Sequence, residues 1–309
     1  MALLHVSRRR LWIALVLVVI GAPAYYAAVM YSPKADESAY TFDAAAVRLL
    51  ADSLPGDKPS EIRFENVMAF EFAGAMVVAG DRWRGTPLPV YSYQLVYPQQ
   101  TVIVDTAMPR SMAKPDFMVP AYDDEAYGRV SAALPKASLI VITHEHMDHI
   151  GGIASYPEPA RLLPALRLSR EQLAHPETMA PAKLAPELVA GIVPLQYEQM
   201  LAIAPGVVLI RAPGHTPGSQ MVYVKRADGR EVLFLGDIAW HRRNIELVRE
   251  RPWFMTALVG ENRAQVLPEL SALHKLAQSN PEIHQVPGHD GEVVQALVAA
   301  GLMQAGFEP

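Results

Sequence analysis

Residues 141–152 read VITHEHMDHIGG, and this short stretch is the strongest indication of the fold. It continues ASLIVIT, residues 137–143, whose run of branched apolar side chains predicts a buried strand. Three histidines, a glutamate and an aspartate then fall within six positions, and Gly151 and Gly152 permit a tight backbone beyond them. A solvated loop would rarely combine these features. The stretch therefore predicts half of a metal site.

The ligand types in this stretch divide into two neighbouring pairs. His144 and His146 are two residues apart after a strand and are expected to point at one cation. Asp148 and His149 follow one step later and are expected to point at a second cation. Glu145 lies between two of these ligands and is expected to point away from the metals, and its role stays open.

Three further ligand types occur downstream, each after an apolar run with high β-propensity and beside a glycine. His215 follows VVLIR in RAPGHTPGSQ, Asp237 follows EVLFL, and His289 follows EIHQV. Any one of them alone is explained more readily by a turn than by a metal ligand. The chain contains no cysteine, so a metal must be bound by His, Asp or Glu. Together the motifs supply five histidines and two aspartates, enough for two cations.

In this order, H-x-H-x-D-H, a later His, an Asp and a final His, the motifs resemble those of the metallo-β-lactamase superfamily. Glyoxalase II and the metal-dependent lactonases share that fold, and the resemblance covers roughly residues 60 to 295. It implies a first metal held by His144, His146 and His215, a second held by Asp148, His149 and His289, and Asp237 bridging the two.

The resemblance also implies an α/β fold, an αββα sandwich of two mixed β-sheets with helices on the outside. The pattern of the chain agrees, because two β-rich halves, 61–106 and 207–237, are each accompanied by helical segments. AMVVAG, residues 75–80, is expected to be part of the first β-rich half. A short helix is expected within 43–56, with Asp43 as its cap and an apolar side formed by Leu49, Leu50 and Leu54.

The seven ligands predict a binuclear hydrolase. Two divalent cations about 3.5–4 Å apart can share one water and lower its pKa to near 7. The hydroxide bridging them is expected to attack an ester, a lactone or a related carbonyl. Asp148 is the expected catalytic residue, since its spare oxygen can accept a hydrogen bond from the hydroxide and pass the proton to the leaving group. Zn²⁺ is the preferred metal, and iron or manganese would also suit these ligands.

Other residues are assigned to the surroundings of the metals. Asp105 in VIVDTA matches an aspartate that, in the superfamily, follows an early strand and orients the ligand loop. Trp240, His241 and Arg242 follow Asp237 and are expected to line the substrate pocket. An aspartate at 237 favours the lactonase and glyoxalase II side of the superfamily, because true β-lactamases usually carry Cys or Ser there.

Alternative functions remain open. The same site would suit phosphodiester or β-lactam hydrolysis, or an oxidoreductase with a single iron. A non-catalytic metal-dependent sensor or binding module is the alternative from another class, although no ligand of the motif has been lost. The net charge of −5 gives no basic surface for nucleic acid, so the expected partner is a small-molecule substrate. The oligomeric state is not indicated.

The first 31 residues predict export. Arg8, Arg9 and Arg10 precede residues 11–31, which contain no charged side chain and are just long enough for a membrane anchor. A cleaved signal peptide ending near Ala22-Pro23-Ala24 is the rival interpretation, and the anchor is preferred. The expected division is residues 1–31 as anchor or signal peptide, 32–60 as linker and short helix, and 61–309 as a catalytic domain in the periplasm or outside.

Overall fold

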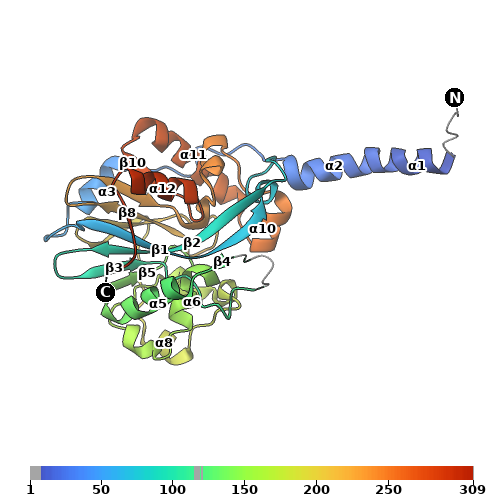
Figure 1. Ribbon diagram of the computed structural model, residues 1–309. Helices are drawn as coiled ribbons and strands as arrows, with labels where there is room; N and C mark the ends of the chain where they lie inside the picture. The colour runs from blue at the N-terminus through green and yellow to red at the C-terminus, as the bar shows by residue number, and fades with distance from the viewer. Residues whose placement is uncertain (1–7, 115–118, 120, 309) are drawn as a thin grey trace.

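Two β-sheets packed face to face form the centre of the protein, and helices cover both outer faces (Figure 1). The computed structural model describes residues 8–114, 119 and 121–308. Helices α5, α6 and α8 lie on one side of the sandwich, and α3 and α11 lie on the other. The predicted αββα sandwich of mixed sheets is confirmed.

The first sheet has the strand order β11-β1-β2-β3-β5, with β4 paired to β1. A long antiparallel hairpin of β1 and β2 forms its middle, whereas β5 runs parallel to β3 and β11 runs parallel to β1. The sheet is therefore mixed. Its strands are β1 (Glu61–Ala73), β2 (Gly85–Val96), β3 (Thr101–Val104), β4 (Ala121–Tyr122), β5 (Leu139–Val141) and β11 (Gln304–Ala305).

The second sheet has the order β10-β9-β8-β7-β6. Strands β6 to β9 form an antiparallel meander, and β10 adds to β9 in parallel. A turn at 227–229 joins β8 and β9, with Gly229 at a φ of +85°. The strands are β6 (Met200–Ala204), β7 (Val207–Arg211), β8 (Gln220–Lys225), β9 (Glu231–Phe234) and β10 (Ile283–Val286).

The main core lies between the two sheets. Phe64 and Tyr93 of the first sheet meet Val222 and Phe234 of the second, and the rings of Tyr93 and Phe234 are 4.3 Å apart. Two further apolar clusters fill the space between each sheet and its helices. Burial of apolar surface in these three layers is the main favourable contribution to folding, and it holds the strand ends in place.

The helices begin at capping residues that the sequence marks. Asp43, Asp123, Asn262 and Asp290 each accept a hydrogen bond from a backbone N–H of the first helical turn. The helices of the body are α3 (Ala44–Ala51), α4 (Gly74–Val77), α5 (Asp124–Ala133), α6 (Met147–Ala154), α7 (Arg170–Ala174), α8 (Pro186–Gly191), α9 (Arg242–Leu247), α10 (Trp253–Val259), α11 (Arg263–Ser279) and α12 (Gly291–Ala299).

Two local predictions were wrong. Helix α3 is capped by Asp43 as expected, and Leu50 packs partly against the core. The inner side, however, is formed by Val47 and Ala51, four residues apart, while Leu49 is 74% exposed and Leu54 is also exposed. AMVVAG does not continue β1: the short helix α4 forms there and the chain turns back into β2. Gly80, at a φ of +80°, allows this reversal of direction.

A helical run of residues 8–30 projects from the body (Figure 1). It consists of α1 (Arg8–Val16), α2 (Ala22–Tyr25) and two stretches of π-helix, Leu17–Gly21 and Tyr26–Met30. Its base is attached through Val29, which is buried and accepts a hydrogen bond of 2.9 Å from the N–H of Gly80.

Within the part of the chain that the structure describes, no helix has both the length and the apolar character needed to cross a membrane. The predicted anchor or signal peptide begins with residues 1–7, which lie outside the described residues. The division into residues 1–31, 32–60 and 61–309 stays a prediction.

Candidate metal centre

The seven predicted ligands come together at one edge of the sandwich, where strands end. His144 and His146 follow β5, and Asp148 and His149 lie in the first turn of α6. The other three follow strands of the second sheet: His215 after β7, Asp237 after β9 and His289 after β10. Strand ends of both sheets meet at this edge, so residues up to 145 positions apart in the sequence become neighbours.

The first group consists of His144, His146, His215 and Asp237, whose ligand atoms all lie within 4.8 Å of one another. The Nδ1 atom of His146 is 3.1 Å from Nε2 of His144 and 3.0 Å from Nε2 of His215. His144 and His215 are fully buried. Three ring nitrogens that converge this closely, beside a carboxylate, form a donor set typical of a transition-metal site.

The second group consists of Asp148, His149 and His289, and it meets the same distance limit of 4.8 Å. Oδ2 of Asp148 is 3.6 Å from Nε2 of His149 and 3.6 Å from Nε2 of His289. All three residues are buried. The grouping matches the division of ligands that the sequence motifs predict.

Asp237 stands between the two groups. Its Oδ2 is 3.7 Å from Nε2 of His144 and 3.5 Å from Nε2 of His215. Its Oδ1 is 3.4 Å from Nε2 of His149 and 3.1 Å from Nε2 of His289. Nε2 of His289 is also 3.2 Å from Oδ2, so it lies between the two oxygens. The carboxylate as a whole therefore contacts both groups, as a bridging ligand requires.

Two unsatisfied polar atoms show that the centre fits metal ions. Nε2 of His149 and Oδ1 of Asp237 are buried and have no hydrogen-bond partner among the described residues. A buried polar atom without a partner is costly, and a bound cation would satisfy both atoms. His, Asp and a bridging carboxylate are also the ligand types that divalent transition metals prefer.

Burial sets the charge state of the first group. It lowers the pKa values of His146 and His215 to about 3, and it lowers the pKa of His144 well below the usual range. These three imidazoles are therefore neutral at pH 7, which is the form that binds a metal. In the second group burial also favours neutral rings, but the carboxylates of Asp148, Asp105 and Asp237 outweigh it and raise the pKa of His149.

Each of three ligand rings is held from behind by an oxygen. Nδ1 of His149 is 2.9 Å from Oδ2 of Asp105, and Nδ1 of His289 is 2.9 Å from the carbonyl oxygen of Pro89. Nδ1 of His215 is 3.2 Å from Oε2 of Glu261. Such partners fix the orientation of a ring and leave Nε2 for the metal.

Asp105 lies where the sequence placed it, directly after β3. Its carboxylate accepts hydrogen bonds from the backbone N–H of Thr143 at 2.6 Å and from the Thr143 hydroxyl at 2.9 Å. Together with its contact to His149, this joins the start of the ligand loop to the first turn of α6. Asp105 has a φ of +60°, an unusual value for a residue with a side chain, so its conformation is held by these contacts.

The structure shows which groups Glu145 contacts. It is fully buried, and its carboxylate accepts hydrogen bonds from the Thr216 hydroxyl at 2.8 Å and from the backbone N–H of Gly218 at 3.2 Å. It therefore points away from the metal ligands, as expected, and joins the loop of His144 and His146 to the loop of His215.

Two more buried glutamates hold the His215 loop, and no sequence motif indicated either of them. Glu261 contacts His215 and forms a fully buried ion pair with Arg251. Glu269 of α11 accepts a hydrogen bond of 3.0 Å from the N–H of Gly214. Their positions depend on how α11 packs, which no local motif encodes.

Glu269 makes stability depend on pH, and Glu269→Gln should reduce that dependence. Burial raises the pKa of Glu269 well above its ordinary value of 4.5. Above pH 4.5 the unfolded chain therefore binds fewer protons than the folded protein, and stability falls as the pH rises. Each unit of the shift corresponds to about 1.4 kcal/mol. Glutamine needs no proton and keeps an acceptor for Gly214.

Urea unfolding of wild type and Glu269→Gln at pH 5 and pH 8 measures this effect. The variant should gain stability relative to wild type, with a clearly larger gain at pH 8. An equal difference at the two pH values would show that Glu269 is not a buried protonated acid.

Trp240 reaches the centre directly. Its indole Nε1–H donates a hydrogen bond of 2.7 Å to Oδ2 of Asp237, and the guanidinium of Arg251 lies 4.9 Å from its ring centroid. Arg251 also pairs with Glu261, and Glu261 contacts His215. Trp240, Arg251 and Glu261 thus connect Asp237 to His215 through a continuous series of contacts. Trp240 thus positions the bridging carboxylate in addition to lining the pocket.

A cavity of about 520 Å³ opens beside the ligands. Trp240 lines it, as predicted for the substrate pocket, together with His146, Asp148, Asp237 and His289. The structure does not bring His241 and Arg242 to this cavity: both line a separate one on the other side of the 289–290 loop. Helix α9 begins directly after His241, and it turns these two side chains away from Trp240. The apolar residues of the wall are Phe70, Phe72, Leu88, Met147, Ala257, Leu258 and Val259.

Comparison with known proteins gives the same picture. The family model described as "Metallo-beta-lactamase superfamily" matches residues 85–289. An N-acyl homoserine lactonase of Bacillus thuringiensis is 26% identical over 174 residues, which cover 52% of this chain and 67% of the lactonase. A probable metallo-hydrolase of Mycobacterium tuberculosis is 33% identical over 175 residues, covering 50% of this chain and 56% of that protein.

Solved structures agree on the fold. The crystal structure of a quorum-quenching N-acyl homoserine lactone lactonase superposes with a TM-score of 0.61 at 20% identity, covering 77% of this chain and 95% of that one. AidC, a dizinc quorum-quenching lactonase, gives a TM-score of 0.51 at 13% identity, covering 76% of this chain and 89% of that one. At these identities the likeness concerns the fold.

Proposed function

This chain belongs to the metallo-β-lactamase superfamily and is distantly related to N-acyl homoserine lactonases, and on that premise we propose that it hydrolyses an ester or lactone with two divalent cations. The observation that carries the proposal is the position of Asp237. Its Oδ2 lies near His144 and His215, its Oδ1 lies near His149, and His289 is close to both oxygens. A single-metal site would not need this arrangement.

Each predicted ligand would have a defined role in holding the two cations. His144, His146 and His215 would hold one cation, Asp148, His149 and His289 the other, and Asp237 both. When bound, two such cations activate a water at neutral pH and polarise the oxygen of a carbonyl group. Zinc suits the histidine-rich donor set, and iron or manganese would fit the same ligands.

Asp148 would move the proton. It lies at the border of the second group and the cavity, so its carboxylate touches both the ligand rings and the space for substrate. A carboxylate in this position can accept the proton of the attacking water and return it to the leaving oxygen. Trp240 and Met147 line the same cavity and would exclude bulk water from the reacting atoms.

The cavity supports a substrate with an apolar part. Phe70, Phe72 and Leu258 line it together with the ligands, and it is large enough for a small amphiphile. The relatives that are named N-acyl homoserine lactonases support a lactone with an acyl chain. The aspartate at position 237 supports the same assignment over β-lactam hydrolysis.

A substrate panel on metal-loaded protein tests the proposal. The panel holds N-acyl homoserine lactones of several chain lengths, an aryl ester, a β-lactam and an aryl phosphodiester. We expect turnover of the lactones or the ester, with a preference for longer acyl chains. Turnover of the phosphodiester alone, or of the β-lactam alone, would replace the carbonyl assignment. Binding without turnover of any member would support a sensor.

A further inference from the structure

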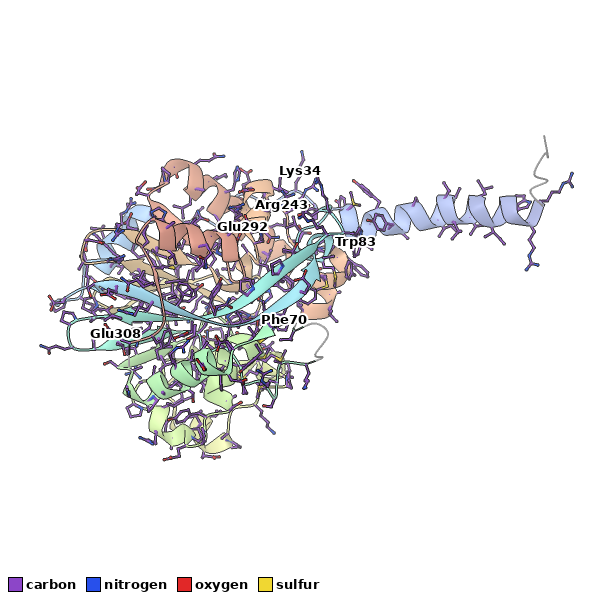
Figure 2. All side chains as sticks on the ribbon, in the orientation of Figure 1. Lys34, Phe70, Trp83, Arg243, Glu292 and Glu308 are labelled. Carbon is purple, nitrogen blue, oxygen red and sulfur yellow. The ribbon has the colours of Figure 1, made fainter. Side chains whose placement is uncertain are left out.

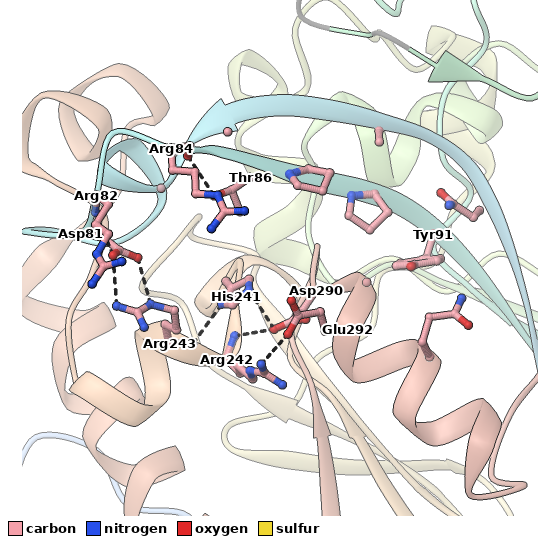
Figure 3. A pocket seen from close by; sticks show the side chains of 18 residues that line it. Asp81, Arg82, Arg84, Thr86, Tyr91, His241, Arg242, Arg243, Asp290 and Glu292 are labelled. Carbon is pink, nitrogen blue, oxygen red and sulfur yellow. Dashed lines mark hydrogen bonds and ion pairs between the residues drawn. The ribbon is translucent and has the colours of Figure 1, made fainter.

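A second, larger cavity lies outside the metal centre. It measures about 930 Å³ and is bounded by the β1–β2 hairpin, the start of α9 and the start of α12 (Figure 3). Among the described residues, the two cavities share no lining side chain. The second cavity therefore does not belong to the site of hydrolysis, and its chemistry has to be considered separately.

Most charged groups of this cavity are already paired with each other. Arg242 pairs with Glu292, and Arg243 forms a two-pronged ion pair with Asp81 at 2.9 and 3.1 Å (Figure 3). Asp290 is buried and accepts hydrogen bonds from two backbone N–H groups, those of Arg242 and Val293. These acidic groups are thus satisfied by partners within the protein.

Two cations of the same cavity have no such partner. The guanidinium groups of Arg82 and Arg84 make no hydrogen bond or ion pair with any residue that the structure describes, and both side chains are exposed. Arg84 extends from the start of β2 toward His241 across the cavity (Figure 3). Tyr91, seven residues further along β2, lines the far end of the same cavity (Figure 3).

The arrangement selects a particular kind of ligand. Two unpaired guanidinium groups carry two positive charges and present planar N–H donors, which match the oxygens of a phosphate. We propose that this cavity is a second ligand site and that it binds a phosphate group through Arg82 and Arg84.

The neighbourhood of the cavity favours a phospholipid headgroup as the source of the phosphate. Trp83 lies between the two arginines, is 57% exposed and donates a hydrogen bond of 2.7 Å from its indole N–H to the Tyr25 hydroxyl at the base of the projecting helix. Figure 2 shows Trp83 at the end of the body from which this helix leaves. Aromatic side chains next to basic ones are typical of surfaces at the boundary between lipid and water.

The projecting helix strengthens this assignment. Between Trp12 and Ile20, all the large apolar side chains described are at least half exposed, and none packs on the body. Apolar side chains in such number are unfavourable in water and favourable in lipid. An apolar helix and two free arginines at the same end of the molecule complement the acyl chains and the phosphates of a bilayer.

The test compares the full chain with Arg82→Gln/Arg84→Gln. The matched control is Arg161→Gln/Arg170→Gln, which removes two exposed arginines between α6 and α8 and changes the net charge equally. Binding is measured by calorimetry with inorganic phosphate, and by co-sedimentation with vesicles of phosphatidylglycerol or of a phosphate-free galactolipid. The galactolipid separates insertion of the apolar helix from recognition of phosphate.

We expect wild type and control to prefer phosphatidylglycerol over galactolipid by at least about tenfold, and Arg82→Gln/Arg84→Gln to lose that preference. Weaker binding of inorganic phosphate by the variant, with an unchanged vesicle preference, would keep the site and make free phosphate its ligand. Equal binding by wild type and variant in both assays, or no phosphate binding by wild type, would overturn the proposal. None of these outcomes depends on hydrolase activity.

Discussion

Replacing Asp237 with asparagine should lower kcat/KM by at least about a thousandfold, which corresponds to about 4 kcal/mol of transition-state stabilisation. The substitution keeps the size of the side chain and changes little else. An amide has one oxygen, so it can face His144 and His215 or it can face His149, but not both. Its NH₂ group would then point at ring nitrogens that need a cation.

The same variant should also bind less metal. With one oxygen lost, the second cation loses the ligand that it shares with the first, and we expect about one equivalent in place of two. The fold should persist, because Trp240 can still donate its hydrogen bond to the remaining oxygen. Thermal unfolding of the metal-free proteins therefore serves as the check that the loss is one of function.

Asp228→Asn is the control for this experiment. Asp228 lies in the turn between β8 and β9 and pairs with Arg226 and Arg230, away from the metal ligands. Its replacement changes the charge equally and should leave activity unchanged. An Asp237→Asn variant that kept two metal equivalents, or activity within about tenfold of wild type, would contradict the bridging role.

Gly152→Ala is expected to have the largest effect on stability, roughly 3 kcal/mol or more. A Cβ at this position would lie 2.4 Å from the carbonyl oxygen of Thr106 and 2.9 Å from its Cβ. Backbone and side chain would have to move, since Thr106 is tied to α6 by its N–H and its hydroxyl, both of which donate to the carbonyl oxygen of His149. The move would also disturb the neighbouring Asp105.

Gly128→Ala is the matched control. Gly128 lies in α5, is exposed and has nothing within 4 Å of an added Cβ, so alanine should stabilise the protein by about 0.5–1 kcal/mol. Urea unfolding of both variants measures the two effects. If Gly152→Ala does not accumulate as folded protein, its yield and protease sensitivity against Gly128→Ala give the same comparison. Two variants of equal stability would show that α6 does not pack tightly at Gly152.

Gly151 and Gly152 were correctly expected to matter for the backbone after the ligands, but the structural reason differs from the expected one. The sequence indicates that Gly151 and Gly152 permit a tight backbone after the ligands. In the structure both lie in helix α6 with ordinary helical backbone, and they are glycines because the helix touches residues 106–108 too closely for a side chain. Close approach between segments distant in sequence cannot be inferred from a local pattern.

The ligand set itself could be predicted because each member follows a strand. A strand end fixes the position of the next few residues, and the ends of several strands meet at one edge of a sandwich. His215, Asp237 and His289 could therefore be assigned from the strands before them. His241 and Arg242 could not, because the helix that turns them away from the metal pocket begins only after Trp240.

Most of the residues that support the ligands could not be predicted from the sequence. Glu261 and Glu269 are far from any motif, and they reach the His215 loop only because α11 packs beside it. The short strand β11 pairs with β1 at the other end of the chain, which residues 300–308 did not suggest. Such contacts between distant segments arise from packing, whereas strand ends and helix caps are determined by residues that are neighbours in the sequence.

The most direct test of the account is an anomalous-scattering map of zinc-loaded crystals. We expect two peaks, one among His144, His146 and His215 and one among Asp148, His149 and His289, with the carboxylate of Asp237 between them. A single peak, or peaks away from these residues in a protein that is active, would contradict it.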